Sequence, residues 1–172
     1  MRALVWIVED TWEATVAEAA AFLPGDAEVT LLHVVPGDVE TLAEGSRHGL
    51  LGRRHPPPPP PAPEPLRAIS DEAAEALLAE ARERFGREAG TERRRGRVER
   101  EVVAAAEGMD ILVLARDGDH SRLGPHSLGP HARFVVDHAP CRVLLVWADA
   151  PPDVDTISPA PQHPREHPPP HH

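Results

Sequence analysis

Four short apolar segments stand out along the chain, at Ala3–Val8, Val29–Val35, Ile111–Leu114 and Val143–Trp147. Each segment is almost continuous in valine, leucine and isoleucine and does not alternate with polar residues. Strands of this composition are buried on both of their faces, as in a parallel sheet. The four segments therefore predict strands of a parallel sheet that helices cover on both sides.

Helical patterns separate these segments. Predicted helices begin at Asp10, at Ser70, at about Arg97 and at Pro130. In the first of them Asp10 is expected to be the N-cap, with Glu13 as its capping-box partner. In the last, the proline stands in the first turn, where a missing N–H group does no harm. Strands that alternate with helices predict an open, doubly wound α/β fold.

A weaker segment, Gly90–Gly96, lies where this alternation requires one more strand. It is rich in arginine, so we expect it at an edge of the sheet, where charge discourages further pairing. In doubly wound sheets ligands bind beyond the carboxyl ends of the strands, where the strand order reverses. The candidate regions for a ligand site are therefore residues 8–11, 34–36 and 115–129.

Proline marks the limits of the folded domain. Of 21 prolines, eight lie in residues 56–65 and eight in residues 151–170. The sequence predicts one domain over residues 1–148, interrupted by a proline-rich disordered insertion at about 37–68, and a disordered proline- and histidine-rich tail over 149–172. The insertion is read either as a tolerated surface segment or as a docking site for a proline-recognising partner.

Charge and composition exclude several functions. The 18 basic and 28 acidic residues give a net charge of −10, which disfavours nucleic acid and anionic membranes as partners. No apolar run approaches the roughly 20 residues of a membrane span, and the N-terminal run is too short for a signal peptide, so a cytoplasmic protein is expected. Every basic residue is arginine, so the chain has no P-loop lysine. The single Cys141 excludes an intrachain disulfide.

The stretch from Leu114 to Cys141 carries the candidate chemistry. It leaves a buried strand, passes glycines at 118, 124 and 129, and enters a helix at Pro130. A glycine loop that leads into a helix N-terminus is a plausible anion cradle. The neighbouring polar residues match no zinc or catalytic spacing, so neither a metal site nor a catalytic residue is expected among Asp117, Asp119, His120, Ser121, His126 and His131.

Three short motifs stand out in the chain, LLHVV at residues 31–35, GMDILVL at 108–114 and HAPCRVLLV at 138–146. They resemble the universal stress protein family, and the resemblance covers most of residues 2–147. This resemblance implies a five-stranded parallel sheet in the order 3-2-1-4-5. It also implies a regulatory module linked to stress rather than an efficient catalyst.

Family members that bind ATP carry the motif G-x2-G-x9-G-[ST] after the fourth strand. Here Gly118 and Gly129 match its second and third glycines, while Ala115 stands at the first. Ten residues separate Gly118 from Gly129 instead of nine, and Pro130 replaces the serine or threonine that contacts phosphate. Because proline lacks both the hydroxyl and the N–H donor, this last departure is the most serious.

Other residues are expected to complete a nucleotide site. Arg116 and Arg122 are expected to supply positive charge to the phosphates. By resemblance, Glu9 or Asp10 at the end of the first strand contacts the nucleotide, and the adenine lies near Val34.

Two interpretations stay open. In the first, the protein binds ATP or AMP where strands one and four diverge. In the second, it is a family member without nucleotide that acts as an interaction module. A slow ATPase is a weaker third. Family members commonly dimerise through the last strand, so a homodimer through Val143–Trp147 is expected.

Overall fold

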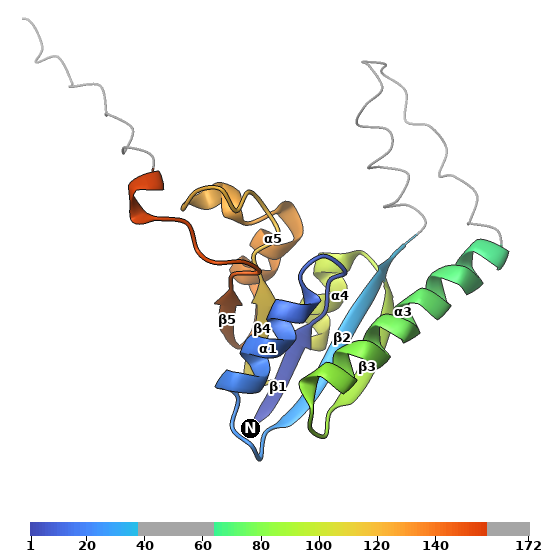
Figure 1. The fold of residues 1–172 in the computed structure, drawn as a ribbon. Coiled ribbons are helices and arrows are strands. Elements are labelled where there is room, and N and C mark those ends of the chain that lie inside the picture. The colour runs from blue at the N-terminus through green and yellow to red at the C-terminus, as the bar shows by residue number, and fades with distance from the viewer. Residues whose placement is uncertain (38–63, 158–172) are drawn as a thin grey trace, which may run out of the picture.

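Five parallel strands form one sheet in the computed structural model, which describes residues 1–37 and 64–157. They are β1 (Arg2–Trp6), β2 (Glu28–Pro36), β3 (Gly90–Gly96), β4 (Ile111–Ala115) and β5 (Arg142–Val146). Their order is β3-β2-β1-β4-β5, with β1 at the centre (Figure 1). The predicted fold class and strand order are confirmed, and so is the edge position of the arginine-rich segment.

Two helices cover each face of the sheet. The helices are α1 (Trp12–Phe22), α3 (Glu64–Phe85), α4 (Val98–Ala105) and α5 (Pro130–His138). Side chains of α1 and α3 pack with one face of the strands, and those of α4 and α5 pack with the other (Figure 1). The four helices thereby make the sheet doubly wound.

The central strand, β1, shows why apolar and polar residues do not alternate along the predicted strands. Along β1, Ala3 and Val5 belong to the apolar cluster under α1 and α3. Leu4 and Trp6 belong to the cluster under α4 and α5, and none of the four is more than 4% exposed. Both faces of the strand exclude water along residues 3–6, so each of these four positions is apolar.

The start of α1 differs from the prediction. Thr11, not Asp10, is the N-cap residue, and no side chain caps the helix there. The Thr15 hydroxyl instead donates to the Thr11 carbonyl oxygen at 2.8 Å. The capping box of Asp10 and Glu13 was therefore wrong, because the N-cap position falls one residue later, at Thr11. Asp10 is left exposed beyond the end of the strand.

The helix α3 begins six residues before Ser70, at Glu64. It takes up the last part of the range 37–68 that was predicted as insertion. Pro65 belongs to the first turn of this helix, where its missing N–H group is not needed. Residues 38–63 and 158–172 lie outside the described residues, and their predicted disorder stays a prediction.

The last strand ends at Val146, one residue before the predicted end. Trp147 follows the strand and contacts the loop after β4. Residues 149–157, predicted as part of the tail, are described and include a short 3-10 turn, η2 (Val154–Thr156). Within the described ranges, no helix is long and apolar enough to span a membrane.

Candidate ligand pocket at the switch point

A cavity of about 500 Å³ opens beyond the carboxyl ends of β1 and β4. The chain crosses from one half of the sheet to the other between these two strands, which is where doubly wound folds place their ligands. Three segments line the cavity: residues 8–14 after β1, residues 117, 118 and 120 after β4, and residues 148 and 149 after β5. The predicted position of the site at the switch point thus coincides with a cavity.

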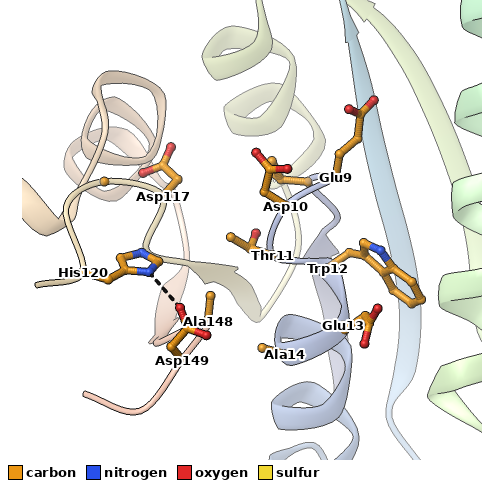
Figure 2. A pocket seen from close by; sticks show the side chains of 12 residues that line it. Glu9, Asp10, Thr11, Trp12, Glu13, Ala14, Asp117, His120, Ala148 and Asp149 are labelled. Carbon is orange, nitrogen blue, oxygen red and sulfur yellow. Dashed lines mark hydrogen bonds and ion pairs between the residues drawn. The ribbon is translucent and has the colours of Figure 1, made fainter. Parts of the chain in front are cut away.

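Carboxylates dominate the lining of this pocket. They belong to Glu9, Asp10, Glu13, Asp117 and Asp149. Figure 2 shows Asp117, His120 and Asp149 on one side of the pocket and Asp10 with Thr11 on the other. No arginine is among the lining residues. These side chains are a source of negative electrostatic potential at the pocket.

His120 joins two walls of the pocket. Its Nε2 lies 2.8 Å from the Arg116 carbonyl oxygen, and its Nδ1 lies 3.4 Å from Oδ2 of Asp149 (Figure 2). Both ring nitrogens of His120 therefore face oxygen atoms of the loop and of the segment after β5. The ring also stands edge-on to Trp147, with centroids 5.8 Å apart.

Asp117 occupies the N-terminal end of α5. Its Oδ1 accepts a hydrogen bond from the Gly129 backbone N–H at 2.6 Å. A Cβ placed on Gly129 would lie 3.0 Å from this carboxylate, so the two groups are in close contact. A carboxylate here is stabilised by the helix dipole, as a bound anion would be.

The glycine loop is also closed by its own backbone. The Gly118 N–H donates to the Ser127 carbonyl oxygen at 3.0 Å, and the Asp119 N–H donates to that of His126 at 2.8 Å. A Cβ on Gly118 would lie only 2.3 Å from the His126 oxygen, which explains why glycine is needed there. The exposed Pro130 has no N–H to offer. The predicted cradle has three backbone positions, at Gly118, Gly129 and Pro130. The N–H groups of the two glycines already donate to acceptors within the protein, and Pro130 has no N–H group.

The two arginines expected near phosphate face other groups. The Arg116 guanidinium lies over the Trp147 ring, 4.5 Å from its centroid, and donates to the Ser127 hydroxyl. Arg122 Nε donates to Oδ2 of Asp119 at 3.0 Å. The pKa of the Asp119 carboxyl falls to about 2, because the Ser121 hydroxyl and N–H and then Arg122 all stabilise its charge. Neither arginine lines the pocket.

The remaining predicted residues fall into two groups. Glu9, Asp10 and Gly118 line the pocket together. Val34 and Ala115 are 3% and 6% exposed and belong to the apolar clusters on opposite faces of the sheet. Neither of these two is among the residues that line the pocket. In the part of the chain that the structure covers, no group of three or more His, Cys, Asp or Glu side chains is placed to hold a metal ion.

The sequence model of the universal stress protein family matches residues 8–146. The chain belongs to the universal stress protein family. Among solved structures, hypothetical protein MJ0577 has a TM-score of 0.60 at 21% identity, over 85% of this chain and 94% of that one. Universal stress protein UspA from Lactobacillus plantarum gives 0.53 at 22% identity, over 85% and 97%.

A further universal stress protein, described in complex with cAMP, gives a TM-score of 0.59 at 15% identity, over 87% of this chain and 98% of that one. At these identities the solved structures establish the common fold alone. No curated protein matches the chain.

The sequence interpretation missed the role of Asp117 in this universal stress protein. The residue was considered only as a metal ligand or a general base, and neither role was expected. A signal was present, because Gly129 precedes a helix without a side chain able to cap it. A carboxylate just before the second motif glycine is a candidate for that cap. Asp149 was also missed, because it was assigned to the tail.

Proposed function

We propose that this universal stress protein is a homodimeric interaction module that pairs through β5 and does not hold nucleotide phosphates. The observation that carries this proposal is the side-chain chemistry of β5 as an edge strand. Val143, Leu144 and Leu145 are all only partly buried, and β4 is the one strand of the described chain that pairs with β5. An apolar edge strand with unpaired backbone groups is a template for pairing with another chain.

A second copy of the chain fits this edge. Antiparallel pairing of two β5 strands satisfies the outward N–H and C=O groups of both and buries the same apolar residues twice. The described strand carries a single charged residue, Arg142, at its start. Like charges therefore do not oppose one another along most of such an interface.

The pocket supports the second half of the proposal. A phosphate needs free N–H donors and positive charge, and here Gly118 and Gly129 donate to groups of the protein itself. The carboxylates that line the cavity add repulsion. Arg116 and Arg122, which were expected to compensate, are bound to Ser127 and Asp119.

Two measurements test the proposal. Sedimentation equilibrium over a hundredfold range of concentration should give a dimer that dissociates on dilution. A thermal unfolding scan with and without Mg²⁺-ATP should give the same midpoint, whereas a ligand at 100 times its Kd would add about 2.7 kcal/mol and several degrees. A monomer at every concentration, or a midpoint raised by ATP, contradicts the corresponding half of the proposal.

A nucleotide with one phosphate, AMP or a cyclic nucleotide, is the second candidate function. It is favoured by the 500 Å³ cavity at the switch point and by the similar universal stress protein that is described with cAMP. A single phosphate carries less charge than ATP into an acidic pocket. AMP and cAMP are therefore included in the same scans. A rise in midpoint that Gly118→Val abolishes supports this candidate.

A further inference from the structure

The segment that follows β5 contacts the loop between β4 and α5 at several points. At one end of the segment, the Trp147 ring lies under the Arg116 guanidinium, and Asp149 lies 3.4 Å from His120. At the other end, the Thr156 hydroxyl oxygen accepts a hydrogen bond from the Leu123 backbone N–H at 3.0 Å. The chain thus spans the loop and is attached to it near both ends.

The Thr156 hydroxyl is held in place by its own turn. It donates to the Asp153 carbonyl oxygen at 2.5 Å, while its lone pair faces Leu123. Asp153 also accepts from the Asp155 N–H at 3.0 Å, which caps the 3-10 turn η2. These hydrogen bonds hold the Thr156 hydroxyl oxygen in position to accept from the Leu123 amide of the loop.

Beyond Trp147, the contacts that hold this segment are polar. The turn η2 contains no buried residue. The apolar side chains of Val154 and Ile157 are 68% and 59% exposed and do not anchor the segment. Segments with few buried apolar contacts open at a much lower free energy than core strands do.

The same segment forms part of the ligand pocket. Ala148 and Asp149 line the cavity, opposite the residues that follow β1 (Figure 2). A displacement of the segment therefore removes one wall of the pocket and one hydrogen bond of the loop together.

We propose that residues 147–157 act as a releasable latch on the pocket. When the latch is closed, Thr156 fixes the Leu123 amide and Asp149 stands beside His120. When it opens, the pocket loses the wall made by Ala148 and Asp149, and the peptide bond between Arg122 and Leu123 becomes accessible. The latch does not depend on whether the pocket takes a nucleotide or on the dimer.

Amide exchange and limited proteolysis of the full chain test the latch. Thr156→Val removes the hydroxyl and keeps the shape of the side chain, so the Leu123 amide should exchange about tenfold faster, as expected for a locally opened segment. Trypsin should cut after Arg122 faster by a similar factor, because the scissile bond includes that amide. Thr156→Ser keeps the oxygen and should behave as the wild type in both assays.

Two controls separate release from general destabilisation. Val154→Ser changes an exposed residue of the same turn and should leave the Leu123 amide unchanged. The Ile7 amide, which donates to the Leu32 carbonyl oxygen at 2.8 Å in the core, should exchange equally slowly in all variants. Unchanged Leu123 exchange in Thr156→Val overturns the proposal, and so does an equal acceleration at Ile7.

Discussion

The two edges of the sheet, β3 and β5, present the same kind of backbone and opposite side chains. Along β3, Arg93 and Arg95 both pair with Asp71 of α3, while Arg94 Nε pairs with Oε1 of Glu92 at 2.6 Å. Along β5 the corresponding positions carry valine and leucine. Since unpaired N–H and C=O groups line both edges, the side chains decide which edge is available to a partner.

This difference in side chains between β3 and β5 indicates different roles for the two halves of the sheet. The β3 half is fastened to its helices by ion pairs, and Glu101 of α4 lies 3.8 Å from Arg94. The β5 half carries the apolar edge and the segment whose Ala148 and Asp149 form one wall of the pocket. Association is therefore expected on the β5 side.

The largest effect is expected from placing a charge on β5. Leu144→Arg makes this edge similar to β3, and burying two like charges in a symmetric interface should weaken the dimer about 100-fold, which is about 2.8 kcal/mol. Sedimentation equilibrium measures the change. Val154→Arg, at an exposed position beyond the strand, is the matched control and should leave the dimer intact. A dimer that survives Leu144→Arg with an unchanged unfolding midpoint does not use β5.

Making β3 apolar, as β5 is, should allow this second edge of the sheet to pair with another chain. Replacing Arg93 and Arg95 together by valine makes β3 apolar, so assemblies larger than the dimer are expected at high concentration. Light scattering after size-exclusion chromatography measures them. The double replacement by glutamine removes the same charges without adding apolar surface. If the glutamine variant assembles equally, loss of repulsion and not apolar pairing is the cause.

A smaller effect is expected at the carboxyl end of β5. Arg116→Met removes the guanidinium from the Trp147 ring and the Ser127 hydroxyl, which should lower the free energy of unfolding by about 1–2 kcal/mol. Urea denaturation measures this change. Arg122→Met, which breaks an exposed pair with Asp119, should have less effect. Equal losses in the two variants would mean that Arg116 does not hold the loop to β5.

The smallest effect, a change in the thermal midpoint, is expected from removing the ion pairs between β3 and α3. Hydrogen bonds from Arg95 and then Arg93 hold the pKa of Asp71 below its ordinary value of 3.8. The pair therefore stabilises the fold above that value, and the contribution is lost as the pH falls below it. Asp71→Asn should lower the thermal midpoint by about 2 °C or less at pH 7, since exposed pairs contribute little. The difference from the wild type should shrink as the pH falls below 3.8.

The fold was predictable because its determinants are local patterns. Unbroken apolar runs identify strands that are buried on both faces, and even the arginine-rich β3 was located from the required alternation. The switch point then placed the pocket, because the order of the strands sets which carboxyl ends meet.

The side chains of the site were less predictable, since each had several partners within reach. Arg116 and Arg122 were expected at a phosphate, but Trp147 and Asp119 hold them. Nothing in the spacing of the motif distinguishes these alternatives. Trp147, the partner of Arg116, comes from the end of another strand, which only folding brings near, whereas Asp119 lies three residues before Arg122 in the same loop.

The closed glycine loop has a consequence for how this protein could change in evolution. Pro130→Ser would restore a hydroxyl and an N–H, yet the Gly129 amide would stay bound to Asp117. Replacing Asp117 alone frees that amide, yet position 130 still lacks a donor and the Gly118 amide still faces Ser127. No single substitution frees all three backbone positions, so a complete cradle requires several changes together.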